Sequence, residues 1–221
     1  ATFLFTPLGS FFLKNERKDL EFFSYQLIFG IILTSFIGLL LNFIFPLNTL
    51  INSPLLLISA YIIIKNKKIY LDKNYIYFSI ISASIIYILI AESNTYRPDA
   101  GLYHLPYISI LNNEKIIIGL SNLHFRFGHI SIIQYFSAIS NNIIFNLNGI
   151  VFGSALIASS VIIYFLSVIS KKFYNKIYDL EFYFIFAIIL FIFYKLNRYS
   201  NYGNDAPAHF LYYFLILQIL I

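Results

Sequence analysis

The residues best suited to chemistry gather in one short stretch that follows an apolar run, residues 75–91. Glu92, Arg97 and Asp99 lie within eight residues, and His104 follows them. A carboxylate in such a place can take a proton from a hydroxyl group or bind a divalent cation. Asp99 also follows a proline, so it can instead cap a helix by accepting hydrogen bonds from backbone N–H groups. The sequence leaves both the catalytic and the capping role open.

Basic and imidazole side chains form a second group further along the chain. His124, Arg126 and His129 lie within six residues. A guanidinium can grip a phosphate through its planar N–H donors, although Arg126 can also extend toward lipid phosphates from a helix end. The two histidines are five residues apart, whereas zinc ligands on one helical face are four apart. The spacing argues against zinc, and the two flanking histidines favour phosphate binding by Arg126.

A third polar group stands where the last apolar run begins. Asn204 and Asp205 precede that run, and Pro207 fits the first turn of a helix. Asp205 is therefore a good candidate for a helix cap. The functional alternative is that these two residues form a second polar wall that faces the loop of Asp99.

The composition indicates a membrane protein. The chain has 221 residues, of which 59% are hydrophobic and 11% are charged, whereas about 25% are charged in a typical soluble domain. No soluble core can bury this much apolar surface, so lipid must be the main solvent. The net charge of +5 falls in short clusters between apolar runs, a pattern of membrane orientation and not of nucleic-acid binding. The chain has no Cys, which excludes disulfides and thiolate metal sites.

Apolar stretches of about 20 residues can cross the hydrocarbon core as helices. Five stretches qualify or nearly qualify, namely residues 22–45, 47–64, 75–91, 149–170 and 206–221. A sixth, residues 182–194, is shorter and can borrow residues 177–180. None shows the alternation of barrel strands. We predict an all-α integral membrane protein with about six transmembrane helices in one domain, residues 1–221. Because the chain lacks an initial Met and ends within an apolar run, we expect a fragment truncated at both ends.

Residues 92–148 are expected to form a long external loop with two short amphipathic helices, at 100–111 and 128–145. In the second, polar residues recur every three or four positions, so it either lies in the membrane interface or lines a cavity as a span. If it does not span, ten Lys and Arg residues share one side of the membrane and five share the other. The positive-inside rule then places the ten in the cytoplasm and Asp99 and Asp205 outside.

Three sequence blocks together carry a family resemblance. They are "DAGLYHLP" (99–106), "GLSNLHFRFG" (119–128) and "NDAPAHFLYYF" (204–214). They resemble an uncharacterised bacterial family of multi-pass proteins related to the GT-C class, whose members are membrane glycosyltransferases that use lipid-phosphate-linked sugars. The resemblance runs through most of the chain.

The resemblance implies roles for particular residues. Asp99 matches the loop acid that acts as base or metal ligand, and Arg126 and His124 match the basic residues that hold the donor phosphate. Four further polar residues of the blocks are candidates for substrate binding, namely His104, Asn122, Asn204 and Asp205. The acidic pair common in that class is missing, because Pro98 precedes Asp99. A divalent cation is therefore an open question, and no other cofactor is expected.

The resemblance implies a GT-C-type glycosyltransferase in the bacterial inner membrane. It would use a polyprenyl-phosphate-linked sugar at the outer face, with the lipid bilayer as its surroundings and no nucleic acid as a partner. The alternatives are a non-enzymatic transporter, flippase or polysaccharide-export component, and a purely structural membrane protein. Transporters tend to place ionisable groups near the middle of the bilayer, and the centres of these apolar runs carry none.

Overall fold

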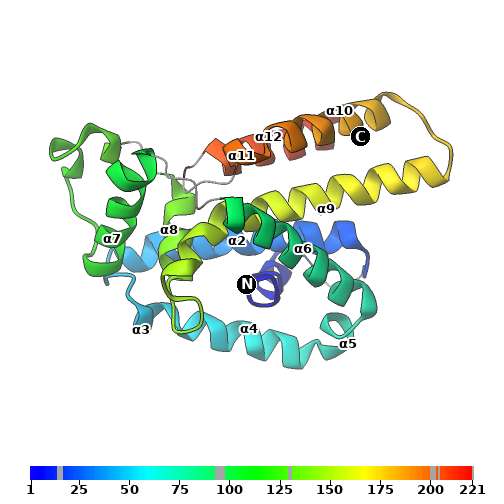
Figure 1. Cartoon of the computed structure of the whole chain (residues 1–221). Coiled ribbons are helices and arrows are strands. Elements are labelled where there is room, and N and C mark those ends of the chain that lie inside the picture. Colours follow the sequence, from blue (N-terminus) through cyan, green and yellow to red (C-terminus); the bar gives the residue numbers. More distant parts are fainter. Residues whose placement is uncertain (14–16, 93–97, 129–130, 200–202, 204, 221) are drawn as a thin grey trace.

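The computed structural model describes residues 1–13, 17–92, 98–128, 131–199, 203 and 205–220, and every regular element among them is a helix (Figure 1). The all-helical prediction is confirmed for these residues. The α-helices are α1 (Thr2–Phe5), α2 (Leu20–Asn42), α3 (Thr49–Asn52), α4 (Pro54–Lys65), α5 (Lys67–Tyr70), α6 (Lys73–Glu92), α7 (Leu105–Asn113), α8 (Ile132–Ser140), α9 (Phe152–Tyr174), α10 (Leu180–Tyr194), α11 (Leu196–Tyr199) and α12 (Asp205–Leu220). Shorter turns are η1 (Pro7–Phe11), η2 (Ala100–His104), η3 (Leu120–Asn122), η4 (Phe125–Gly128) and η5 (Asn146–Val151).

Three helical stretches are long and apolar enough to cross a membrane. They are α2, residues Lys73–Ile90 of α6, and Asn146–Tyr174, which joins η5 to α9. The stretches Thr49–Lys65 and Leu180–Tyr194 are helical, apolar and shorter. Pro54 is the first residue of α4, and because proline has no N–H group it interrupts the helical hydrogen bonds between α3 and α4, although Ser53 keeps helical backbone. Among the described residues, only these three predicted spans reach full length.

The same four residues, Asp-Leu-Glu-Phe, begin α2 and α10. Asp19 and Asp179 each accept a hydrogen bond from the backbone N–H three residues later, at 3.1 and 2.9 Å, and so cap these helices. Two adjacent lysines at the end of α9 reach both starts. Lys171 Nζ lies 2.7 Å from Glu21 Oε1, and Lys172 Nζ lies 2.6 Å from Asp179 Oδ2. The end of α9 is therefore tied to the starts of both α2 and α10.

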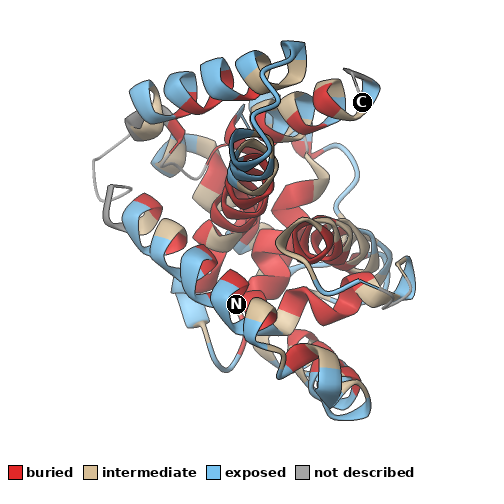
Figure 2. Cartoon of the chain, turned by 90° about the vertical axis from the view of Figure 1, so that its right-hand side faces the viewer, coloured by how far each residue is buried: buried red, intermediate tan, exposed pale blue. Residues whose placement is uncertain are grey.

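Helix α9 forms the centre of the bundle. Residues 153–165 of α9 are all buried, and the helix packs against α2, α6, α8, α10 and α12. Figure 2 shows burial concentrated on the inner faces of the helices, with the outer faces exposed. The exposed faces carry many large apolar side chains, such as Leu57, Tyr87 and Phe193. Such broad apolar exposure is what helices surrounded by lipid require.

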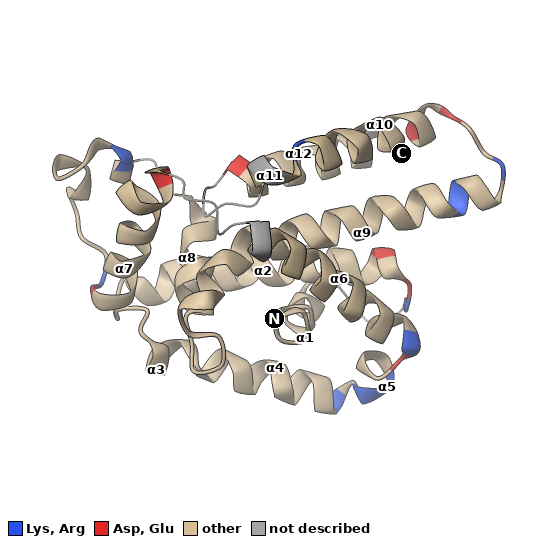
Figure 3. Ribbon diagram, in the orientation of Figure 1, with Lys and Arg blue, Asp and Glu red and all other residues tan. Residues whose placement is uncertain are grey.

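Charged residues mark two ends of the bundle (Figure 3). At the basic end, Lys18 Nζ lies 3.6 Å from Asp72 Oδ2, so the start of α2 adjoins the start of α6, and the lysines at the end of α9 join them. At the other end, here called the α7 end, α8 packs on α2 and α7 packs on α8. Asn42 Nδ2 of α2 donates to Glu114 O just after α7, at 3.0 Å. The lysines of residues 65–73 and those of residues 171–176 are distant in sequence, and both groups lie at the basic end.

Helix α8 occupies an unexpected place within residues 128–145. It has 9 residues, so at 1.5 Å per residue it is too short to span. Residues 133–140 are all buried against neighbouring helices. On its polar face, Ser131 and Gln134 form a capping box, and Gln134 also contacts His104. Helix α8 is therefore a short buried helix and not a cavity-lining span.

Candidate functional site

Asp99 precedes an unusual turn. Residues Ala100–His104 form η2, a π-helical turn that continues into α7. The backbone of Asp99 is already helical, with φ −60° and ψ −32°, whereas a capping residue has extended backbone. Its carboxylate accordingly makes no capping hydrogen bond and is exposed. The capping interpretation of Asp99 is therefore wrong, and the carboxylate faces solvent. π turns are frequent at functional sites.

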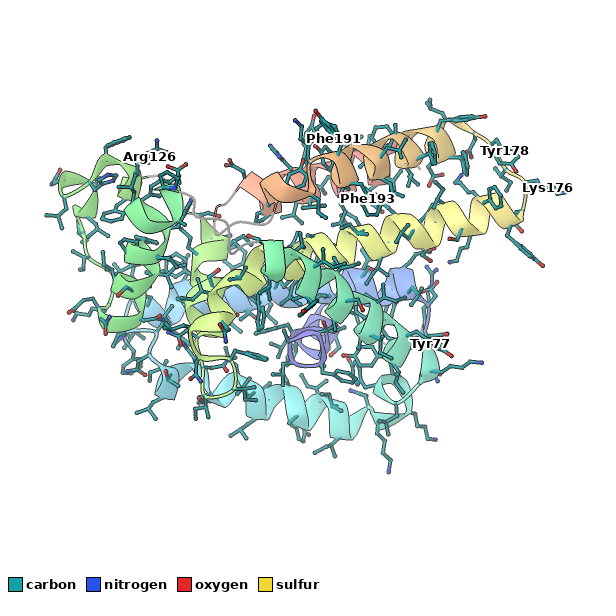
Figure 4. All side chains as sticks on the ribbon, in the orientation of Figure 1. Tyr77, Arg126, Lys176, Tyr178, Phe191 and Phe193 are labelled. Atoms are coloured by element: carbon teal, nitrogen blue, oxygen red, sulfur yellow. The ribbon has the colours of Figure 1, made fainter. Side chains whose placement is uncertain are left out.

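Arg126 is held against this turn (Figure 4). Its Nη1 donates a hydrogen bond to Tyr103 Oη at 3.3 Å, and its Cζ lies 4.8 Å from the centre of the Tyr103 ring. The ring of Phe125 lies on another side, 5.5 Å from Cζ. Cation–π contacts of this kind fix a guanidinium while leaving most of its N–H donors free. Arg126 is exposed and forms no ion pair with the residues that the structure describes.

His104 is the buried residue of the site, with 6% of its surface exposed. Its Nδ1 lies 3.5 Å from Gln134 Nε2 of α8. With the amide donating, Nδ1 is the acceptor and the ring proton sits on Nε2. Burial lowers the pKa of His104, Asp99 and Asp205 oppose that change, and Arg126 adds to it. The imidazole is therefore neutral at pH 7.

Asp205 reaches the same place from a distant part of the chain. It is the first residue of α12, and its charge, like that of Asp99, acts on both His104 and Tyr103. Burial raises the pKa of Tyr103, as do Asp99 and Asp205, while Arg126 lowers it. Asp99, Tyr103, His104, Arg126 and Asp205 thus gather at the α7 end of the bundle, and we call them the Asp99 cluster.

Comparison with known proteins identifies a family. A model for a domain of unknown function, DUF8201, matches residues 1–221, the full chain. The chain belongs to the DUF8201 family. No curated protein and no solved structure shows significant similarity to it.

Of the other predicted site residues of this DUF8201 domain, one is exposed on η3, one supports Arg126, and one is outside the described residues. Asn122 is exposed on η3. His124 is half-buried, its ring packs on Phe125 and Phe127, and its Nδ1 accepts from the backbone N–H of Arg126 at 3.3 Å. His124 therefore supports the loop of Arg126. Asn204 is outside the described residues, as are Arg97 and His129.

Two residues of the site escaped the sequence reasoning. Tyr103 orients Arg126, but tyrosine is so abundant in this DUF8201 domain that its type alone indicates little. Gln134 contacts His104, and its signal was present in the polar face of the second amphipathic stretch. Among the described residues, no group of three His, Cys, Asp or Glu side chains could hold a metal ion by itself.

Proposed function

We propose that this protein is a GT-C-type glycosyltransferase that transfers a sugar from a polyprenyl-phosphate carrier to a hydroxyl acceptor. The observation that supports it best is the Asp99 cluster, in which Arg126 is held on the Tyr103 ring and the charges of Asp99 and Asp205 act on Tyr103 and His104, at one end of a bundle of apolar helices. The lipid chain of such a carrier stays in the bilayer while its phosphate lies at headgroup depth. Chemistry on it therefore needs charged groups at the mouths of membrane helices.

The arrangement of the helices fits a multi-pass protein of the bacterial inner membrane. The three full-length stretches cross directly, and α3 with α4, α10 and α12 complete six spans, since short apolar helices are accommodated by local thinning of the bilayer. The basic end then lies in the cytoplasm, as the positive-inside rule requires. The Asp99 cluster, at the α7 end, lies at the outer face.

The cluster offers the groups that sugar transfer requires. Asp99 accepts the proton of the acceptor hydroxyl as the oxygen bonds to the anomeric carbon, and the bond between that carbon and the carrier phosphate breaks. Arg126, oriented by Tyr103, donates hydrogen bonds to the departing phosphate. Mg²⁺ takes one or two protein carboxylates together with substrate phosphates. A divalent cation would be held by Asp99 together with the donor phosphate.

A transport function is less well supported. The Asp, Glu, Lys and Arg residues of α2, α6, α9 and α10 all lie in a first or last turn. A transporter of charged substrates places such groups near the middle of the bilayer. The polar residues buried inside the described helices are uncharged, and they are mostly Ser, Thr, Asn and Gln.

The test is sugar transfer by the full-length protein in membranes, with a radiolabelled polyprenyl-phosphate sugar as donor. Asp99→Asn removes the base and keeps the shape, so we expect at least a hundredfold loss of transfer with an unchanged melting temperature in detergent. Glu114→Gln is the matched control, because Glu114 is an exposed carboxylate at the same end that lies outside the cluster. Wild-type transfer by a stable Asp99→Asn protein would refute the proposed role.

A further inference from the structure

A second polar feature lies at the α7 end, distinct from the Asp99 cluster. It is a cavity of about 650 Å³, within the range of small-molecule sites. No member of the Asp99 cluster lines it, and none of its lining residues is charged. Five of them are asparagines, which come from four segments of the chain: Asn48, Asn112, Asn113, Asn141 and Asn148. Ser109 and Thr49 add hydroxyl groups.

Some of these amides build the wall of the cavity. Asn112 Nδ2 donates to Leu47 O at 2.6 Å and to Ala138 O at 3.1 Å, and its Oδ1 accepts from Asn141 Nδ2 at 2.9 Å. These bonds tie α7 to the end of α8. Asn48 Oδ1 caps α3 by accepting from Ile51 N at 3.0 Å. Their positions are therefore fixed before any ligand binds, which lowers the entropic cost of binding.

Other polar groups of the lining remain available to a ligand. Asn148 is exposed and makes no hydrogen bond with the described residues. Asn113 uses its Nδ2 to donate to Ser109 O at 2.8 Å, which leaves its Oδ1 as an acceptor. Ser109 is exposed on the same face of α7. The cavity therefore presents both donors and acceptors, with aliphatic side chains such as Ile90 and Leu105 between them.

This lining selects a class of ligand. A charged ligand would lose hydration without finding an opposite charge, so the ligand is neutral. Side-chain amides and hydroxyls each donate and accept, and a ligand that matches them has many hydroxyl groups and apolar C–H faces. We propose that the cavity binds a neutral saccharide. Helix α7 joins the two features, because His104 precedes it and Ser109 lies one turn further along. Resting on the proposed function, this saccharide is the acceptor, whose hydroxyl reaches Asp99.

The test measures saccharide binding to the purified full-length protein in nanodiscs by titration calorimetry. The probes are three neutral trisaccharides, namely maltotriose, cellotriose and chitotriose, with trigalacturonate as a charged counterpart of similar size. We expect at least one neutral probe to bind and trigalacturonate not to bind. Absence of binding by all three, or equal binding of trigalacturonate, would overturn the proposal.

Variants locate the binding. Ser109→Leu fills the cavity and should weaken binding at least tenfold, and Asn148→Ala should weaken it about fivefold through a lost hydrogen bond. Ser121→Leu is the matched control, because Ser121 is exposed at the same end and does not line the cavity. Melting temperatures verify that each variant is folded. Unchanged affinity in both folded cavity variants would place the ligand elsewhere and refute the proposal.

The outcome is separable from the proposed function. If the protein binds a saccharide but sugar transfer does not depend on Asp99, the proposed saccharide site stands and the proposed glycosyltransferase function is refuted. If transfer depends on Asp99 but no saccharide binds, only the proposed saccharide site is refuted. Displacement of the bound trisaccharide by the lipid-linked sugar, and not by polyprenyl phosphate, would assign the cavity to the donor sugar and refute its role as acceptor site.

Discussion

His104 is buried, whereas its partners in the Asp99 cluster are exposed or half-buried. Burial and Arg126 lower its pKa below the ordinary value of 6.5, and the two carboxylates only partly oppose them. A neutral imidazole suits this place, because a proton there would bring a cation beneath Arg126. The side chain therefore links the electrostatics of the cluster to the stability of the fold.

This linkage has a defined sign. As the pH falls below 6.5, the unfolded chain takes up a proton on this imidazole before the folded protein does, so stability is lost until the pH passes the lower folded pKa. His104→Asn keeps an acceptor near Gln134 and removes the titration. We expect the melting temperature in detergent to fall more in the wild type than in His104→Asn between about pH 7.5 and about pH 5.5. Equal losses in both proteins would contradict the linkage.

At the scale of elements, local chemistry predicts helices better than it predicts their contacts. Apolar length sufficed for α2, α6 and α9, and the Asp-Leu-Glu-Phe starts are ordinary caps. The burial of α8 was not predictable, because its polar side chains find partners on other elements, as Gln134 does with His104. It was equally unpredictable from the sequence that the Asp99 carboxylate makes no capping hydrogen bond, since this depends on the helical backbone of that residue. A polar wall of Asp205 facing the loop of Asp99 was expected only as one alternative, and the structure shows that both charges act on Tyr103 and His104.

The N-terminal segment packs closely on α2, and this contact between elements can be tested by substitution. A Cβ atom on Gly30 would lie 2.0 Å from Phe5 O, and one on Gly9 would lie 1.9 Å from Gln26 O, so backbone meets backbone here. Gly30→Ala must push the segment away, and we expect a loss of about 1–3 kcal/mol in unfolding free energy. Gly101→Ala is the control, because no atom lies within 4 Å of its added Cβ. Equal stability of the two variants, measured by denaturant unfolding in detergent, would refute this close contact.

At the scale of the whole molecule, the ion pairs of the basic end and the polar groups of the α7 end are separated by the length of the helices. The basic end is held by ion pairs, such as Lys171 with Glu21 and Lys18 with Asp72. The α7 end combines the Asp99 cluster with the asparagine-lined cavity. Between them, some buried hydroxyls pair with one another, as Ser82 Oγ does with Ser159 Oγ at 2.9 Å, and others donate to a backbone carbonyl one turn earlier, as Thr34 Oγ1 does to Gly30 O at 2.7 Å. Such a division suits a protein that works at one surface of a membrane.

The separation of the ends gives a topological prediction that does not depend on catalysis. The chain has no cysteine, so single introduced cysteines report their side of the membrane without background. Ser121 lies exposed at the α7 end, and Ser170 and Lys67 lie exposed at the basic end. By the positive-inside rule, an impermeant maleimide should label the Ser121→Cys variant in intact cells. It should label the Ser170→Cys and Lys67→Cys variants only after the membrane is opened. Because α4, α6 and α9 connect the two ends, both basic-end variants must respond alike. If Ser170→Cys is labelled in intact cells while Lys67→Cys stays protected, the two residues do not share one end of the molecule. If both are labelled while Ser121→Cys stays protected, the orientation is reversed and the Asp99 cluster lies at the cytoplasmic face.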